Sequence, residues 1–363
     1  MFLLAFPPRT SKGSKQMVRA GHSTVSTVVV AAMVTCKVVV LVCLEIELAR
    51  SATSVPRGLT DSVVTQLNKP TSMTVAPDGR LFVTQKASSN VGKVRVIKNG
   101  QLLSKPFLKL DTDTSYFRGV LGITLDPNFS SNHYVYVFYT ATSPTVHNRV
   151  SRFTANGAVA VASSEKVIIE LPILGTTGGH YGGSLRFATD GGLYVGVGDG
   201  VADETATNVA QSLDSLNGKI LRINSDGTIP SNNPFFNSTS GNSRAIWALG
   251  VRQPYSLDVL SGTSPRMYIN DVVEDGWEEI DEAAAGANYG WGFPNSPPFY
   301  EGFVASPDPT LQNYQNTVFA YAHGTTADTS CAITGGRSTT RPRCASPPST
   351  RASTSTPTTA ADG

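Results

Sequence analysis

Residues 183–199 read Gly-Ser-Leu-Arg-Phe-Ala-Thr-Asp-Gly-Gly-Leu-Tyr-Val-Gly-Val-Gly-Asp, with short alternating segments on both sides of an Asp-Gly-Gly turn. This pattern predicts a β-hairpin, because a period of two suits a strand and Asp-Gly suits a tight turn. Comparable hairpins are predicted at 71–85, 121–139 and 255–272. The sequence therefore repeats one structural unit along the chain.

The spacing of these hairpins indicates the architecture. From Met73 to Gly122, Leu185 and Leu257, the successive intervals are 49, 63 and 72 residues. One four-stranded blade with its loops fits each interval, so we expect an all-β propeller over residues 55–336. A β-sandwich would explain the alternation but not the recurrence of the hairpin.

Other segments add to this pattern. Further strands are predicted at 94–97, 149–153, 167–171 and 220–223, and one short helix at 210–216. The span of roughly 280 residues holds four or five blades, fewer than a closed ring of six needs. We therefore expect the propeller to be incomplete toward the C-terminus.

The composition agrees with an all-β protein. The 33 glycines and 22 prolines among 363 residues suit many tight turns, and 40% apolar residues are enough for a sizeable core. The formal net charge is +2. No basic face is expected, so nucleic acid is not a predicted partner.

The N-terminal segment resembles a targeting signal. Four basic residues precede an apolar run at about 25–43, and small residues near position 50 suit a signal peptidase. We expect residues 1–52 to be a signal peptide, which would make the protein secreted or periplasmic. The run is also close to the length of a membrane span, so an uncleaved anchor is the alternative.

The C-terminal segment 337–363 differs from the rest. It consists largely of Ser, Thr, Pro, Arg and Ala without a strand pattern, which is typical of a disordered linker. In a shifted reading frame, however, its codons can encode a string rich in aromatic residues. We hypothesise that a frameshift has replaced the final blade. Cys331 and Cys344 could form a disulfide by their spacing, but Cys344 lies in this altered segment.

The glycine-rich segment 178–183 contains His180 and leads into the hairpin that ends near Asp199. A His at one strand start and an Asp at the adjoining strand end can lie side by side. The Asp would then orient the imidazole and stabilise its protonated form, as a general base requires. The alternative is a structural His capped by an Asp in a turn.

Two further segments could bind a ligand. Arg252 and Gln253 precede a strand that starts at a proline, and the Arg side chain suits a carboxylate or quinone oxygen. The stretch 270–280 is acidic, and acidic side chains with loop carbonyls are ligands that Ca²⁺ selects. A surface ion pair and a solvated acidic turn are the respective alternatives.

Together these segments resemble the soluble sugar dehydrogenases that depend on pyrroloquinoline quinone (PQQ), the glucose, sorbosone and aldose dehydrogenase family. The resemblance rests on Arg118–Phe129, His180–Gly183, Gly198–Gly200, Leu216–Asn224, Gly250–Pro254, Trp277–Ile280 and Asn288–Trp291. It extends over about 55–336 and implies a six-bladed propeller. It also implies an enzyme that oxidises a sugar hydroxyl, passes hydride to PQQ and delivers electrons to an acceptor.

The resemblance implies specific roles for the site residues. His180 would be the base, Asp199 would hold it, and Arg252 would contact the quinone. The implied PQQ contacts are Arg252, Gln253, Val273, Glu274 and Arg118, with Gln253 in place of the family's usual Asn. The implied Ca²⁺ ligands are the carbonyls of Val273 and Glu274, with Glu279 beside them.

Two departures from the family pattern affect these expectations. The cationic residues that grip the PQQ carboxylates come largely from the last part of the family's chain, which this sequence lacks in recognisable form. Phe117 stands where family members often carry a polar residue. The alternatives are a non-catalytic propeller that binds a carbohydrate or protein ligand, as in the hedgehog-interacting protein, and a lactonase-like hydrolase that uses Ca²⁺.

Overall fold

The structure is a computed structural model, and it describes eleven segments of the chain. These are residues 26–32, 40–45, 60–86, 89–173, 179–200, 207–260, 266–273, 276–293, 301–305, 307–324 and 332–335. The segment 337–363, both cysteines of the possible disulfide and Glu274 lie outside them.

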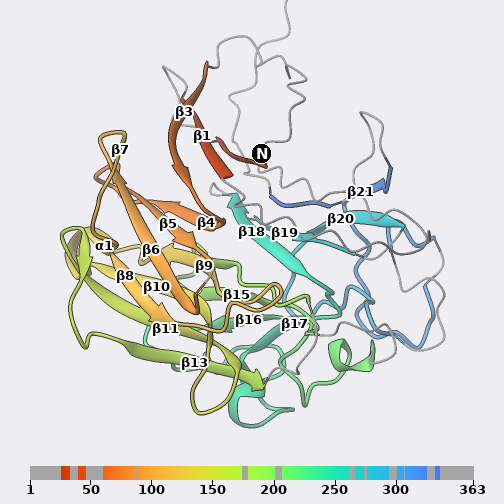
Figure 1. Cartoon of the computed structure of the whole chain (residues 1–363). Helices are drawn as coiled ribbons and strands as arrows, with labels where there is room; N and C mark the ends of the chain where they lie inside the picture. The colour runs from red at the N-terminus through yellow and green to blue at the C-terminus, as the bar shows by residue number, and fades with distance from the viewer. Residues whose placement is uncertain are drawn as a thin grey trace, which may run out of the picture.

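Four antiparallel sheets follow one another in chain order (Figure 1). The first blade contains β4 (Pro70–Val75), β5 (Leu81–Gln85), β6 (Val91–Lys98), β7 (Gln101–Leu102) and β8 (Leu108–Asp111). The second contains β9 (Val120–Leu125), β10 (Tyr134–Ala141), β11 (His147–Asn156), β12 (Val159–Ala160) and β13 (Lys166–Ile173), with the single-turn helix α1 (Phe129–Asn132) between β9 and β10.

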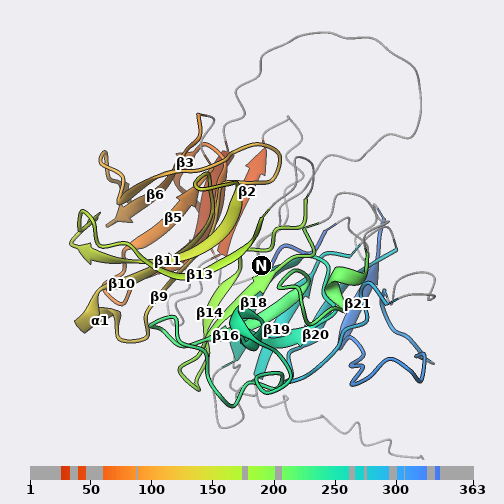
Figure 2. The ribbon, with the colours of Figure 1, turned by 90° about the horizontal axis from the view of Figure 1, so that it is seen from below.

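The other two blades are four-stranded meanders. The third blade contains β14 (Leu185–Phe187), β15 (Leu193–Val197), β16 (Lys219–Ile223) and β17 (Ile246–Leu249), with 3₁₀ helices η1 (Thr207–Ala210) and η2 (Gly241–Ala245) in its loops. The fourth contains β18 (Pro254–Leu260), β19 (Arg266–Asp271), β20 (Trp277–Glu282) and β21 (Phe319–Ala322), which lie side by side in Figure 2.

The blades pack through their first strands. Strand β4 contacts β9, β9 contacts β14, and β14 contacts β18. A first strand that meets the first strand of the next sheet is the arrangement of a propeller, in which the inner strands surround a common axis. The predicted all-β propeller is therefore confirmed, with four blades in the described residues.

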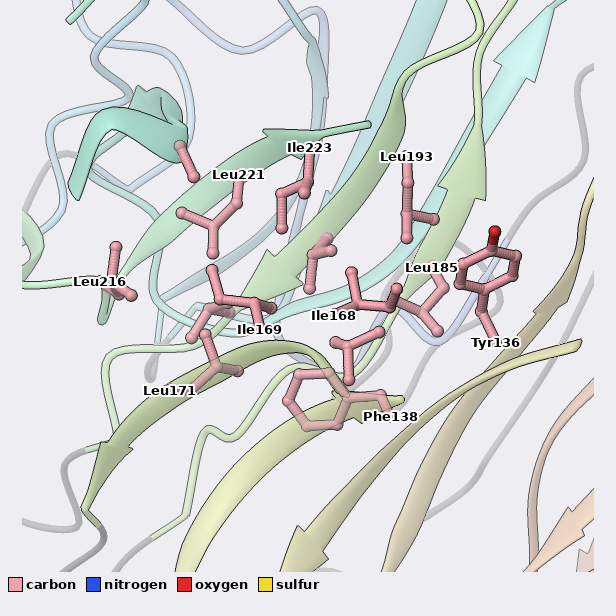
Figure 3. Close-up of a cluster of buried hydrophobic side chains, with 14 of the residues drawn as sticks. Tyr136, Phe138, Ile168, Ile169, Leu171, Leu185, Leu193, Leu216, Leu221 and Ile223 are labelled. Carbon is pink, nitrogen blue, oxygen red and sulfur yellow. The ribbon is translucent and has the colours of Figure 1, made fainter. Parts of the chain in front are cut away.

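The core lies between successive blades. Tyr136 and Phe138 from the second blade pack against Leu185, Leu193 and Leu221 from the third (Figure 3). A second apolar cluster joins the first two blades, and a third joins the last two. Each sheet is thus buried on both faces where it has neighbours, which explains why its strands are rich in apolar residues.

The structure confirms the four additional strands that were predicted but not the predicted helix. All four extra strand predictions fall inside strands of the structure, namely β6, β11, β13 and β16. The helix predicted over 210–216 is wrong, because η1 ends at Ala210 and turns follow. Ser212 and Ser215 accept hydrogen bonds from the backbone N–H groups two residues ahead, and such local bonds compete with a helix.

A smaller sheet lies at the N-terminal end of the described chain. It has the order β2-β1-β3 and consists of β1 (Ser26–Ala32), β2 (Val40–Glu45) and β3 (Thr60–Leu67). Most of the predicted signal or anchor segment 1–52 lies outside the described residues. Among the residues that are described, no helix has the length and hydrophobicity to cross a bilayer.

Candidate functional site

The loop before β14 and the loop after β15 bring His180 and Asp199 together. The imidazole Nδ1 of His180 lies 2.9 Å from Oδ1 of Asp199. Asp199 is buried, with a side chain 3% exposed, whereas the His180 side chain is 24% exposed. Within the described part of the chain, Nε2 of His180 has no hydrogen-bond partner. The pair thus has the geometry predicted for a base with a carboxylate behind it.

Close backbone packing keeps this pair in place. The backbone N–H of Gly200 donates to the carbonyl of His180 at 3.1 Å. A methyl group on Gly198 would overlap this same carbonyl, so only glycine fits there. His180 has φ 52°, a left-handed conformation that costs most residues energy and marks a tightly constrained position.

Arg252 lies beside the pair in the loop that enters β18. Its backbone carbonyl accepts a hydrogen bond from the N–H of Asp199 at 2.8 Å. Its Nη1 donates to the carbonyls of Val272 and Val273 at 3.1 and 3.0 Å. Its Nε is buried and has no hydrogen-bond partner among the described residues. A buried donor without a partner is costly, which points to an acceptor supplied by a ligand.

Gln253 joins the Arg252 loop to the His180 loop. Its side-chain Oε1 accepts a hydrogen bond from the N–H of Gly182 at 2.9 Å. The amide that was predicted to contact the cofactor therefore also supports the backbone next to His180.

Asp271 holds the backbone of the same loop. Its two carboxylate oxygens accept the N–H groups of Arg252 and Gln253 at 2.9 and 2.6 Å. Burial raises the pKa of Asp271 to about 6, although both hydrogen bonds oppose this shift. Asp271 had no predicted role, and only its place in the acidic stretch 270–280 pointed to it.

Trp291 completes the group from a distant loop. Its indole Nε1–H donates to Oδ2 of Asp199 at 2.8 Å, and the Arg252 guanidinium lies 5.3 Å from the ring centroid. The side chain is 3% exposed. Trp291 was singled out only as part of the motif Asn288–Trp291, without a role.

Arg118 is placed one step from His180. Its Nη1 donates to Asp113 at 2.7 Å, and its Nε donates to the hydroxyl of Tyr181 at 3.1 Å. The guanidinium is buried and lies over the Tyr181 ring. The structure thus shows Arg118 supporting the neighbour of His180, and a contact with a cofactor stays a prediction.

The predicted calcium ligands are only partly described. The Val273 carbonyl accepts the bond from Arg252, and Glu279 is buried and accepts the N–H of Gly302. Burial, reinforced by Asp281, raises the pKa of Glu279 well above its usual range. No three Asp, Glu, His or Cys side chains gather as metal ligands in the described segments.

A family model described as glucose/sorbosone dehydrogenase matches residues 67–340, which is more than half of the chain. The chain belongs to the glucose/sorbosone dehydrogenase family. This membership confirms the resemblance drawn from the motifs, and it supports a sugar oxidoreductase function.

Two relatives of the chain are named as sugar dehydrogenases. Aldose sugar dehydrogenase YliI of Escherichia coli strain K12 is 29% identical over 235 residues, covering 62% of this chain and 59% of its own length. Quinoprotein glucose dehydrogenase B of Acinetobacter calcoaceticus is 26% identical over 251 residues, covering 63% and 51%. The chain thus spans little more than half the length of these relatives.

The chain is also similar to a solved structure and to a relative that is not named as a dehydrogenase. The putative glucose dehydrogenase of Thermus thermophilus has a TM-score of 0.59 at 27% identity, covering 70% of this chain and 69% of that one. The mouse hedgehog-interacting protein is 29% identical over 218 residues, covering 53% of this chain and 30% of its own. Membership in this family therefore does not by itself establish catalysis.

Proposed function

We propose that this chain oxidises a hydroxyl group of an aldose or related sugar and passes the hydride to PQQ, with Ca²⁺ bound beside the cofactor. The observation that carries the proposal is the His180–Asp199 pair next to the Nε of Arg252, which has no partner among the described residues. A non-catalytic propeller would need neither a poised base nor a buried donor without an acceptor. The name of the Acinetobacter relative as a quinoprotein supports the choice of cofactor.

The residues present fit a quinone. Arg252 offers a buried N–H donor to an anionic or carbonyl oxygen, and the planar guanidinium suits such acceptors. Gln253 lies beside it with a side-chain amide. PQQ, when bound, would supply the acceptor for the hydride.

The side chains of the protein would carry out the proton transfer of the reaction. His180 would accept the proton of the sugar hydroxyl at Nε2, while its Nδ1–H donates to Asp199. Asp199 then stabilises the imidazolium, and its burial keeps water from competing for that bond. The His180 ring is the partly exposed member of the pair, so a sugar could reach it.

One backbone oxygen in the described chain supports the proposal that Ca²⁺ binds here. A carbonyl oxygen has two lone pairs, and Arg252 uses one of those on Val273. Val273, with Glu274 and Glu279, would hold the calcium ion, which would supply Lewis acidity toward the quinone. The guanidinium shares this oxygen, so we expect calcium to bind tightly only with the anionic cofactor present.

The remaining expectations belong to the same proposal. They comprise a six-bladed ring, secretion, an electron acceptor as the second partner and the frameshift in 337–363. Resequencing the gene tests the frameshift directly, because an intact frame through codon 337 contradicts it.

The test of function uses two matched substitutions. His180 and His133 both have left-handed backbone, with φ 52° and 58°, and asparagine tolerates that conformation. The purified chain with PQQ and Ca²⁺ should oxidise aldoses in the presence of an artificial electron acceptor. His180→Asn should lower turnover about 1000-fold, in the range for loss of a general base. His133→Asn, in an exposed turn, should leave it unchanged.

Cofactor binding is measured separately through the absorbance of bound PQQ. Unchanged binding in His180→Asn with lost turnover supports the assigned role. Absence of both binding and turnover in the wild-type chain would favour the non-catalytic propeller.

A further inference from the structure

Trp291 contacts both sides of the candidate site. Its indole N–H donates to the Asp199 oxygen that does not face His180, while the ring lies against the Arg252 guanidinium. One residue thus touches the carboxylate behind the base and the cation beside it. It packs with Ala210 and Val273 and has almost no contact with solvent.

The Asp199 carboxylate needs two fixed partners to hold one orientation. Its Oδ1 is bonded to His180 and its Oδ2 to Trp291, at 2.9 and 2.8 Å. Hydrogen bonds to an ionised carboxylate are stronger than neutral ones, and burial strengthens them further. Removal of the indole N–H would take away one of the bonds that hold the carboxylate in line with the imidazole.

Trp291 is itself held by the backbone at both ends. Its N–H donates to the carbonyl of Gly250 at 3.0 Å, and its carbonyl accepts the side chain of Gln211 at 2.7 Å. Gln211 forms two hydrogen bonds with Asn288, at 2.9 and 2.7 Å. Loops of the third and fourth blades therefore together position the indole ring of Trp291.

We propose that Trp291 is a positioning residue that fixes the tautomer of His180. By orienting Asp199, it keeps the proton of the imidazole on Nδ1 and leaves Nε2 as the lone pair that faces the substrate. The effect on turnover rests on the proposed function. The effect on the tautomer does not, because it depends only on the hydrogen bonds of the protein without cofactor.

The first test is nuclear magnetic resonance of the histidine side chains in the chain without cofactor. The wild type should show the Nδ1-protonated tautomer at the signal that His180→Asn removes. Trp291→Phe keeps an aromatic ring under Arg252 but loses the N–H, so this signal should move toward a mixture of tautomers. Trp247→Phe is the control, because Trp247 in β17 packs edge-on against Tyr194 in β15 of the same blade.

The second test is kinetic and uses the chain loaded with PQQ and Ca²⁺. Loss of a hydrogen bond to a charged group should lower kcat about tenfold in Trp291→Phe, with KM nearly unchanged. In an Asp199→Asn background, the same substitution should have little further effect, because its route to His180 is already broken. Equal losses in both backgrounds would show that Trp291 acts through general structure and would overturn the proposal.

A second replacement keeps the test decisive if Trp291→Phe does not fold. Benzothienylalanine at position 291 has nearly the shape of tryptophan and carries sulfur in place of the N–H. It should reproduce the change of tautomer. A wild-type His180 signal in this variant overturns the proposal. If the wild-type chain oxidises no aldose, the proposed function fails while the resonance experiment still decides the role of Trp291.

Discussion

At the interface between the second and third blades, Tyr136, Phe138 and Leu193 are buried among other apolar side chains. At the interface between the third and fourth blades, the loops at one end bury Asp199 and Asp271 with only a few apolar neighbours. The first interface is stabilised by removing apolar surface from water, which has no preferred direction. An apolar cluster also joins the third and fourth blades, but their loop end depends on hydrogen bonds, which fix directions. Stability and orientation are thus supplied by different parts of one fold.

The apolar interface should show the largest effect on stability. Leu193 is fully buried in strand β15, and Leu193→Ala should lower the free energy of unfolding by about 3 kcal/mol through lost burial and a cavity. Denaturant unfolding measures this change. Val161→Ala, at a 43% exposed position, is the control and should change it little. A similar loss in both variants would mean that the blades are not packed as described.

The loop end of the third blade, which buries polar groups, should respond to pH through Lys219. This buried side chain donates to the carbonyls of Val209, Ala210 and Asn217 at 2.7–2.9 Å. Lys219→Met leaves three carbonyls without a donor and should cost about 2 kcal/mol at pH 7. The same unfolding experiment measures it, with Lys98→Met on the exposed end of β6 as control.

The stability of the wild type depends on pH because the pKa of Lys219 differs between the folded and the unfolded chain. Burial lowers the pKa of Lys219 from 10.5 to about 7. Between these values the unfolded chain binds more protons, so the wild type should gain stability relative to Lys219→Met as pH rises from 7 toward 10. A constant difference over this range would show that the three carbonyls keep the ammonium charged.

The smallest effect on stability is expected at β21 of the fourth blade, where apolar side chains are exposed in the described structure. Phe319 in β21 is 53% exposed and Val318 is 45% exposed. Phe319→Ser should change the free energy of unfolding by no more than about 0.5 kcal/mol. It should also reduce self-association in light scattering, because exposed apolar patches promote contacts between copies. A loss of several kcal/mol would show that this face is covered in solution.

The apolar interfaces could be predicted from the sequence because they arise from local alternation. The strands at 94–97 and 220–223 were found in this way, and both lie in buried positions of β6 and β16. The helix at 210–216 failed because Gln211 and the serines that follow use their side chains for bonds that a periodicity does not reveal.

The candidate site could be predicted only where its residues border one hairpin. His180 and Asp199 flank β14 and β15, so their proximity follows from the hairpin itself. Trp291 is 92 residues from Asp199, and its bond to that carboxylate depends on how two blades pack. No local pattern contains that contact. Asp271 and Arg252, by contrast, flank the hairpin of β18 and β19, so their contact follows from one strand pairing, like that of His180 and Asp199.

The close approach of Gly198 to the His180 carbonyl limits how this site can diversify. A side chain at position 198 would overlap this carbonyl, so any other residue there would push the two segments apart. Phe117, whose ring lies against Gly179, is by contrast a side chain that can change without moving this backbone. Sequence variation near the imidazole is thus expected in the surrounding side chains and not in the glycine beneath it.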